Sequence, residues 1–494
     1  MGIGIIVVTV DITSINVALP AIEKSFNIDL KTIEWIVNGY LLAFAVLMVT
    51  CGRLADMYGR KKIFLIGLVL FGTASLIAGL SQSAGLLIAM RVLQGAAGAF
   101  LWPTIIGICY ASVTDTQKGL AIGIVMAVSG FGNAAGPLVG GFLTEYYSWR
   151  WVQFINVPLA ILAGVITLFV VKEQDTDDND QGIDFIGILL ISLAVISFLY
   201  ALDQSTEWGL ISLPTMGLIL LSLVLLGIFI KVEPSQLSAL IPPDVMKNKT
   251  FMTYCIIMFT IVPTFFCLFL YVPQYLEKFN NFSPVKAGAG LVPMLIFYSA
   301  VSAFSGSFYN RLGPRITIFF GMLITALGTY CTALFGFSND FLLLALSTSI
   351  CGIGIGLSIP SITNGGVSSV NESRASLASG LIFMFQLCGA VLGLAIISTI
   401  FIDTAITDFS SRISYLDLNL SNIEIENVKS FLLGSNPETI IKSELGNQLY
   451  TTLIPHIRDS YEKGLQYGLV FSGSVIVVGA MINFIFTKEN TKDT

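Results

Sequence analysis

The sequence predicts an all-α polytopic membrane protein with fourteen transmembrane helices, and three observations support this. First, 55% of the 494 residues are hydrophobic and only 11% are charged, where soluble proteins average about 25% charged residues. So few polar side chains cannot cover a water-exposed surface, which excludes a soluble enzyme, a nucleic-acid binder and a disordered scaffold. Second, the apolar residues fall in long runs. Third, part of the chain repeats.

The apolar runs are long and do not alternate with polar residues, which favours helices over barrel strands. The first run has only about ten residues before Asp11, short of the roughly 20 that cross a bilayer. We therefore expect a helix that is short at its cytoplasmic end, or a start that lies upstream. The fourteen runs are residues 2–22, 35–54, 63–80, 85–110, 119–143, 151–171, 185–202, 210–231, 251–273, 287–309, 315–335, 341–362, 376–402 and 464–486.

Basic residues in the short connections predict the orientation. One set of connections carries fourteen Lys and Arg residues and the opposite set carries five. The positive-inside rule places the richer set in the cytoplasm. We therefore expect a multi-pass protein of the cytoplasmic (inner or plasma) membrane with both termini in the cytoplasm. The long segment 403–463 is then an extracytoplasmic loop, where a partner could bind.

An internal repeat divides the chain into two halves. Residues 52–61 align with 306–315 at an offset of 254, and residues 95–123 align with 352–380 at an offset of 257. We predict six-helix halves at 1–172 and 251–486, two inserted helices within 173–250, and a tail at 487–494. Parallel halves of this kind build one large transporter fold, with the substrate site at their interface near the midplane.

Charge and residue usage narrow the chemistry. The net charge of −6 leaves no basic surplus for nucleic acid. The single histidine, His456, lies in a polar segment, and the seven cysteines lie in or beside apolar runs. We therefore expect no metal site and no disulfide framework. Neither a Walker loop nor a nucleophile–base set is present, so we expect a non-enzymatic protein without a cofactor.

A glycine-flanked acidic and basic motif follows the second run. Glycines permit close helix approach and a tight turn, the acid can cap a helix, and the basic cluster anchors the loop at the cytoplasmic face. The motif resembles the loop between helices 2 and 3 of the major facilitator superfamily, which implies a conformational latch. The alternative is a basic loop that only sets topology. The motif residues are Gly52, Asp56, Gly59, Arg60 and Lys61; Asn310 replaces the acid in the second half, where we expect a weaker latch.

An arginine lies inside the fourth run. Arg91, Gln94, Gly95 and Gly98 resemble the helix 4 signature of the same superfamily. A charged side chain inside the membrane needs a partner or a water-filled cavity. The resemblance implies a role in proton coupling for Arg91. The alternative is a structural arginine satisfied by backbone carbonyls.

The fifth run carries a glycine motif that lets helices pack backbone to backbone, with a proline expected to kink the helix. It resembles the helix 5 signature of the superfamily's antiporters, which implies export by antiport. The alternative is a plain helix-packing motif. Its residues are Gly132, Gly136, Pro137, Gly140 and Gly141.

Three more segments resemble the fourteen-helix drug:proton antiporter subfamily. They are residues 11–20, 35–43 and 149–158, and with the motifs above they cover most of the first 160 residues. The second half matches only loosely. The resemblance implies multidrug efflux, and places the shared machinery mainly in the first half.

Asp11 is the acid best placed to carry a proton. A carboxylate near the middle of a membrane helix takes up a proton more readily than one in water. It can exchange that proton against a cationic or polar substrate. The alternative is a structural aspartate bonded near Thr13 or Asn16. Asp203, Glu207 and Asp403 are expected at the outer ends of helices, in contact with solvent.

A central cavity needs apolar and aromatic walls with a few polar points. Beside Asp11 and Arg91, we select Asn38, Tyr40 and Gln386 as candidate coupling or substrate residues. Each candidate could instead be a packing or lipid-facing residue. Further candidates for the wall are Trp102, Tyr254, Gln274, Asn364 and Phe383.

Together these features predict a secondary transporter that exports small amphipathic, drug-like compounds in exchange for protons. The proton gradient supplies the energy, and helices 1–6 rock against helices 9–14. One alternative is a dedicated exporter of a single metabolite, such as a siderophore or lipid. The other is a membrane sensor or scaffold that does not transport, with a partner bound at segment 403–463.

Overall fold

The computed structural model describes residues 1–487 except 29, 173–181, 237, 281, 283, 338–340, 416–427 and 429–437. Within these residues the secondary structure is helical and contains no strand, and thirteen helices are long and apolar enough to cross a membrane. The predicted number was fourteen. The difference lies in α14 (Val292–Cys331), which joins two predicted runs through Gly313, whose φ of 79° and ψ of 164° are not helical.

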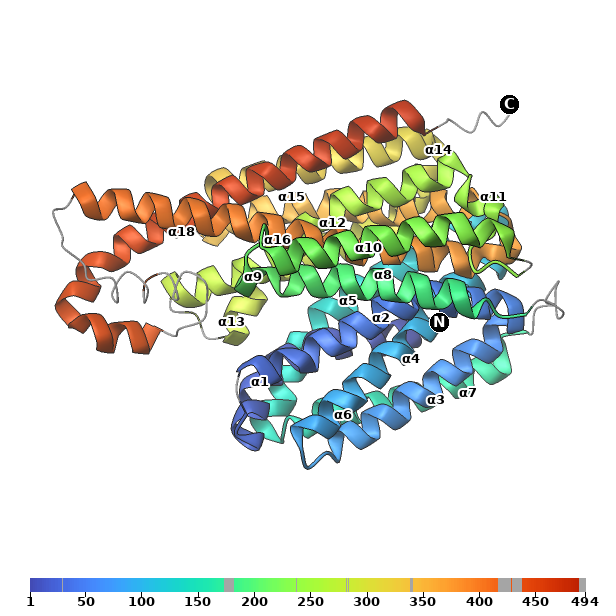
Figure 1. The fold of residues 1–494 in the computed structure, drawn as a ribbon, viewed down its shortest axis with the longest axis horizontal. Helices are drawn as coiled ribbons and strands as arrows, with labels where there is room; N and C mark the ends of the chain where they lie inside the picture. Colours follow the sequence, from blue (N-terminus) through green and yellow to red (C-terminus); the bar gives the residue numbers. More distant parts are fainter. Residues whose placement is uncertain are drawn as a thin grey trace.

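The first seven helices form one body, drawn in blue to cyan in Figure 1. Polar residues mark some of their boundaries: Ser83 caps α4 by accepting a hydrogen bond from the amide of Leu86. Gly59 precedes α3 with a φ of 98°, a conformation that favours glycine. The helices are α1 (Gly2–Phe26), α2 (Leu30–Tyr58), α3 (Arg60–Gly79), α4 (Ala84–Ala111), α5 (Asp115–Tyr146), α6 (Arg150–Phe154) and α7 (Asn156–Val170).

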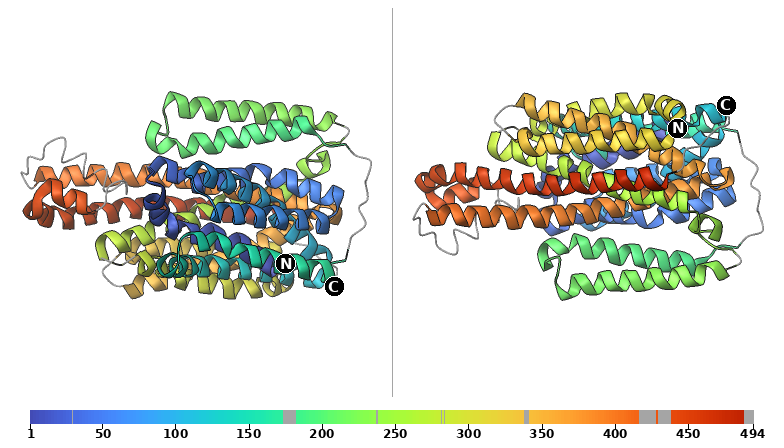
Figure 2. Two further views of the ribbon diagram at one scale, coloured as in Figure 1. Left: turned by 90° about the horizontal axis from the view of Figure 1, so that it is seen from below. Right: turned by 90° about the horizontal axis from the view of Figure 1, so that it is seen from above.

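A helix pair follows and stands to one side of the remaining helices (Figure 2). It consists of α8 (Phe185–Asp203) and α10 (Leu213–Val232), linked by α9 (Ser205–Trp208). The hydroxyl of Ser222 in α10 donates to the carbonyl of Ala194 in α8 at 2.7 Å. The short elements η1 (Glu233–Ser235) and α11 (Pro243–Met246) lead to the rest of the chain.

The remaining helices form the second body, yellow to red in Figure 1. Two of them, α16 and α18, project well beyond the other helices at one end. The elements are α12 (Lys249–Asn280), α13 (Pro284–Ala289), α14, η2 (Thr332–Gly336), α15 (Phe341–Ser368), η3 (Glu372–Arg374), α16 (Ala375–Tyr415) and α18 (Glu438–Phe486).

These projecting helices correct the prediction of a loop over residues 403–463. Residues 403–415 continue α16, and residues 438–463 belong to α18. Asp408 of α16 accepts hydrogen bonds from two residues of α18, Lys463 at 2.5 Å and Ser460 at 3.0 Å. Within α16 it also accepts one from Arg412 at 2.6 Å. These polar contacts stabilise the helices beyond their apolar runs. A search for apolar runs therefore does not find these parts.

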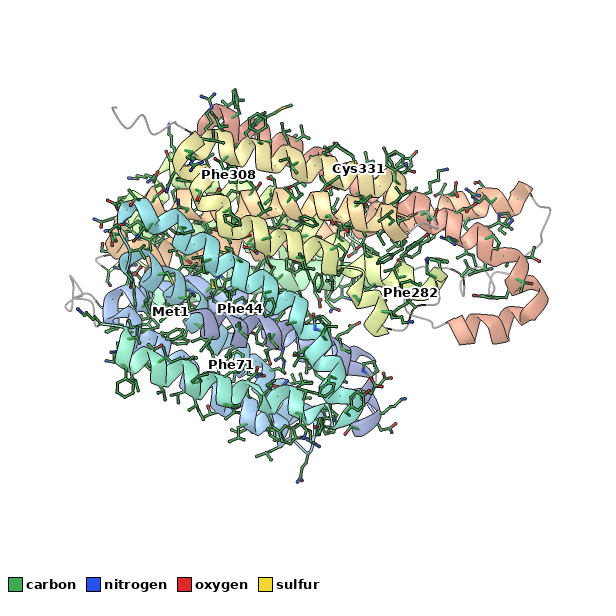
Figure 3. All side chains as sticks on the ribbon, turned by 180° about the vertical axis from the view of Figure 1, so that it is seen from behind. Met1, Phe44, Phe71, Phe282, Phe308 and Cys331 are labelled. Carbon is green, nitrogen blue, oxygen red and sulfur yellow. The ribbon has the colours of Figure 1, made fainter. Side chains whose placement is uncertain are left out.

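The two bodies meet where small residues allow close contact. A Cβ on Gly123 would lie 2.4 Å from the carbonyl oxygen of Ser302, and one on Gly380 would lie 2.6 Å from that of Met48. The repeat matches Gly123 with Gly380, so equivalent glycines occupy equivalent contacts. Phe44 and Phe71 are buried within the first body, whereas Phe308 is exposed on the outer surface (Figure 3).

Candidate functional site

Asp11 lies fully buried in α1 and forms an ion pair with Arg91 of α4. Its Oδ2 accepts a hydrogen bond from Arg91 Nη1 at 2.6 Å, and its Oδ1 accepts one from Asn156 Nδ2 at 2.7 Å. Thr13 instead donates to the carbonyl of Thr9, and Asn16 is exposed. The structure therefore brings the two predicted charges together, and the alternative bonding of Asp11 near Thr13 or Asn16 is not found.

Arg91 uses its remaining donors within the same body. Its Nε donates to the carbonyl of Ile36 at 3.1 Å, and its Nη1 also donates to Gln94 Oε1 at 3.1 Å. The guanidinium lies 4.4 Å from the centre of the Tyr40 ring, close enough for a cation–π interaction. Only one of these partners is a backbone carbonyl, so carbonyls alone do not satisfy the arginine.

Through Gln94, the hydrogen bonds extend from Arg91 to two further helices, α3 and α6. Gln94 Nε2 donates to Ser75 Oγ in α3 at 2.6 Å and to Gln153 Oε1 in α6 at 3.0 Å. Tyr40 Oη, Gln153 Nε2 and Asn156 Oδ1 are buried with no hydrogen-bond partner among the described residues. Buried polar groups normally have a partner, so each of these three atoms can still form a hydrogen bond.

Sequence reasoning did not assign Ser75, Gln153 and Asn156 to this network. Gln153 and Asn156 stand within segment 149–158, quoted above for its resemblance, and a polar residue in an apolar run is a signal that could have found them. Ser75 carries no such signal, because single serines are common in membrane helices.

Glycines set the spacing of the helices around Asp11 and Arg91. A Cβ on Gly95 would lie 2.1 Å from the carbonyl oxygen of Tyr40, so α4 and α2 touch beside the arginine. In the helix 5 motif, a Cβ on Gly132, Gly136 or Gly140 would lie 1.8–2.4 Å from atoms of α1. This motif therefore packs against the helix that carries Asp11. Gly141 is also buried in α5, and the helix continues through Pro137.

Asn38 and Gln386 lie outside the network of Asp11. Asn38 Nδ2 donates to Asp203 Oδ1, at the end of α8, at 2.8 Å. Asp203 was expected to be solvated; it is partly buried because α2 packs against α8, where Trp35 and Tyr200 also meet at 6.4 Å. Gln386 lies in α16, with a buried Oε1 that has no partner among the described residues.

A row of aromatic rings crosses from the first body to the second. The ring centres of Tyr40 and Phe44 lie 5.9 Å apart, those of Phe44 and Trp102 6.4 Å apart, and those of Trp102 and Phe383 4.8 Å apart. Two predicted wall residues, Trp102 and Phe383, thus meet at the interface. Figure 3 labels Phe44 within the first body. The other predicted wall residues, Tyr254, Gln274 and Asn364, lie on α12 and α15, outside this row.

Asp56 joins the two bodies at the opposite end from the projecting helices. It pairs with Arg60 at 2.9 Å within its own body. Its Oδ1 and Oδ2 accept hydrogen bonds from the amides of Ser376 at 3.3 Å and Leu377 at 2.8 Å. These amides belong to the first turn of α16, where a carboxylate stabilises the helix N-terminus.

Arg60 and Gly52 extend this contact. Arg60 donates to the carbonyl of Gly107 at 3.1 Å and to that of Glu372, in the second body, at 2.6 Å. A Cβ on Gly52 would lie 2.6 Å from the carbonyl oxygen of Ser376. Lys61 differs, because its Nζ donates to the carbonyl of Leu168 within the first body.

The second half has a matching but uncharged contact. Asn310 of α14 donates to the carbonyl of Thr116 in α5 at 2.8 Å. Lys118 adds an ion pair across the bodies, with its Nζ 2.9 Å from Glu372 Oε2. The contact that Asp56 makes with α16 therefore has a neutral counterpart, related by the repeat, in the contact of Asn310 with Thr116.

Residues 1–394 match the Major Facilitator Superfamily. The chain is 27% identical to the tetracenomycin C resistance and export protein of Streptomyces glaucescens, covering 100% of this chain and 91% of the relative. It is 25% identical to multidrug resistance protein 3 of Bacillus subtilis (strain 168), covering 100% and 95%.

Its fold is similar to that of the proton:xylose symporter XylE, with a TM-score of 0.63, 12% identity, and 99% and 94% of the two chains covered. The human organic anion transporter MFSD10 gives a TM-score of 0.59 at 12% identity, with 98% and 97% covered. The chain belongs to the Major Facilitator Superfamily and is a multi-pass membrane transporter rather than an enzyme.

Proposed function

We propose that this transporter exports small amphipathic, drug-like compounds in exchange for protons, in a cytoplasmic membrane and with both termini in the cytoplasm. The observation that carries the proposal is the buried pair of Asp11 and Arg91, at the centre of a network from six helices. The relatives named for resistance and export support the direction and the class of substrate.

Protonation of Asp11 supplies the coupling step. A proton on Asp11 removes the negative charge that faces Arg91, so the 2.6 Å ion pair weakens. Arg91 keeps its bonds to Ile36 and Gln94 and its contact with Tyr40. Since Asp11 belongs to α1 and Arg91 to α4, the weakened pair changes the preferred packing of these helices, and protonation becomes linked to conformation.

The substrate binds along the aromatic row between the bodies. Tyr40, Phe44, Trp102 and Phe383 offer ring faces to an apolar or aromatic compound. Tyr40 Oη and Trp102 Nε1 are buried without a partner among the described residues, so they can bond a polar group. Tyr40 touches both this row and Arg91, which brings the substrate close to the proton site.

Alternating access then requires the latch to open. The bodies are joined by Asp56 with the first turn of α16 and by Lys118 with Glu372. The basic connections at this end support a cytoplasmic location. In the proposed orientation, the conformation is therefore closed on the cytoplasmic side. Opening it admits the next substrate, and closing it again commits the substrate to export.

Transport in inverted membrane vesicles tests the coupling. Ethidium uptake driven by a proton gradient is measured for the wild type and for Asp11→Asn, with Glu145→Gln, at an exposed carboxylate of α5, as control. We expect Asp11→Asn to lose proton-driven uptake but to keep exchange of labelled for unlabelled ethidium. Proton-driven uptake that is unchanged in Asp11→Asn would contradict the coupling role.

A second candidate function is export of a single metabolite. Asp11 is the one carboxylate of the described network around Arg91, and a site with one acid suits a narrow range of cationic compounds. A relative named for one compound, tetracenomycin C, agrees with this. A panel of dyes and metabolites distinguishes the two: transport of several unrelated dyes favours drug export, and transport of one compound alone favours the dedicated exporter.

A further inference from the structure

An apolar cavity of 430 Å³ lies between the helix pair α8 and α10 and the second body. Its walls come from α8, α10, α12, α16 and the connection around Val245. The volume falls in the range of sites that hold small organic molecules, about 300–1,000 Å³. The cavity is separate from the Asp11 network and the aromatic row, none of whose residues line it.

The walls contain almost no polar group that could bind water. The hydroxyl of Ser222 is the one hydroxyl in the lining, and it already donates to the carbonyl of Ala194. The other lining side chains are aliphatic or aromatic, or carry sulfur, as Met384 and Cys388 do. An ordered water needs two to four polar partners, and protein interiors rarely keep large voids. An apolar molecule is the occupant that fits these walls.

The cavity opens toward the surface that faces lipid. Three of its lining residues, Leu223, Leu226 and Ile230, are also 58%, 39% and 50% exposed along the membrane-spanning α10. Figure 2 shows α8 and α10 standing beside the other helices, so the cavity lies behind a helix that the bilayer surrounds. In a bilayer, the apolar molecules present at high concentration beside this opening of the cavity are the acyl chains of lipids.

We propose that this cavity holds one acyl chain of a bilayer phospholipid. The chain fills the space between α10 and α16, so it completes the packing of the helix pair against the second body. The lining of the cavity includes Cys388 and Leu381 of α16 as well as Ala194 of α8. The lipid is therefore a structural partner of the full chain, and this assignment does not depend on the transported substrate.

Photolabelling tests the proposal on the full-length protein in phosphatidylcholine vesicles. The probe is phosphatidylcholine with a diazirine in one acyl chain, and labelled residues are mapped by peptide mass spectrometry. Phe251, Leu381 and Met384 line the cavity but are buried from the outer surface. We expect label at these three positions as well as at the exposed Val224 of α10. Label at Val224 without label at the buried positions would overturn the proposal.

Two filling variants, one in α8 and one in α16, sharpen the test. Ala194→Leu and Cys388→Phe should each reduce label at Met384 by about tenfold, the change produced by a loss of roughly 1.4 kcal/mol of binding free energy. Val224→Phe, on the outer face of α10, is the matched control and should leave that label unchanged. Label that persists in both filling variants would overturn the proposal. Displacement of the label by saturating ethidium would also overturn it, because a transported compound would then be the occupant.

Discussion

At the scale of single residues, the pair of Asp11 and Arg91 bears on both stability and the proposed coupling. Both side chains are buried, and the pair is hydrogen-bonded on every side to α2, α4 and α7. A buried pair of this kind adds little net stability compared with an apolar replacement, but the loss of one partner is costly. Stability therefore does not explain the buried pair, and the proposed coupling role, which needs both charges, does.

The first prediction separates the net contribution of the ion pair to stability from the cost of losing one partner. Arg91→Met leaves the carboxylate of Asp11 buried without its cation, which should cost about 3–5 kcal/mol. The double variant Arg91→Met with Asp11→Leu removes both charges and should recover most of that loss. Thermal unfolding in detergent measures both. A double variant that is less stable than Arg91→Met alone would contradict this account of the pair.

The second prediction concerns Gly95. A Cβ there would lie 2.1 Å from the carbonyl oxygen of Tyr40, whereas at Gly217 in α10 nothing lies within 4 Å. Gly95→Ala should therefore destabilise the protein by about 1–3 kcal/mol and disturb Arg91. Gly217→Ala should stabilise it slightly, by about 0.5–1 kcal/mol, since alanine favours a helix. Unfolding temperatures of the two variants provide the comparison, and equal shifts would contradict it.

The sequence predicted the two charges but not all of their partners. An acid and an arginine in apolar runs stand out, because burying a charge in a membrane is expensive. Asn38 and Tyr40 are two residues apart in one run, yet Tyr40 contacts Arg91 while Asn38 bonds Asp203. Residues two apart face different sides of a helix, and the rotation of each helix depends on packing that a single sequence does not show.

At the scale of elements, the contact between Asp56 and α16 holds the bodies together at one end. The carboxylate of Asp56 accepts hydrogen bonds from two amides in the first turn of α16. Gly52, which has no side chain, allows α2 to approach that turn. The matching contact, from Asn310 to Thr116, is a single neutral hydrogen bond. The two joints are related by the repeat but differ in strength, because charged hydrogen bonds are roughly twice as strong.

The third prediction follows from this difference. Asp56→Asn should weaken the joint and raise the population of the conformation open at this end, whereas Glu145→Gln, at an exposed carboxylate near the other end of α5, should not. Labelling of a cysteine at Ser376 by a maleimide reports the opening, because Ser376 is fully buried. Equal labelling rates in Asp56→Asn and the parent protein would exclude a latch role for Asp56.

The helices also show where apolar runs predict elements well. Long apolar runs predicted most of the membrane helices, because a run of about 20 apolar residues has the length of a helix that crosses the bilayer. The kink at Gly313 in α14 falls between two predicted runs, so the boundary predicted there coincides with a break in the helical backbone. The projecting parts of α16 and α18 were missed, because their helices depend on side-chain pairs such as Asp408 with Lys463 rather than on apolarity.

At the scale of the whole molecule, the proposed cycle requires the bodies to separate at the latch end. Lys118 and Glu372 face each other across that interface at 2.9 Å. Their positions connect the start of α5 with η3, just before α16. A covalent bridge between these positions should prevent opening.

The fourth prediction uses such a bridge. In a variant without the seven native cysteines, Lys118→Cys and Glu372→Cys are joined by a bifunctional methanethiosulfonate reagent. Ethidium transport should be lost on bridging and restored by dithiothreitol, because the bodies must part in each cycle. The single variants treated with the same reagent are the controls. Full transport by the bridged protein would exclude opening at this interface.

One helix connects the two ends of the molecule. α16 is continuous from Ala375 to Tyr415, so at 1.5 Å per residue it is about 60 Å long. The amide of Leu377 in its first turn donates a hydrogen bond to Asp56 of α2. Its far end is bound to α18 through the contact of Asp408 with Lys463. A rigid rod of that length converts a tilt of about 10° into a displacement of about 10 Å at its tip. A fluorophore on the projecting end would therefore report whether the contact of Asp56 with the opposite end of α16 is open.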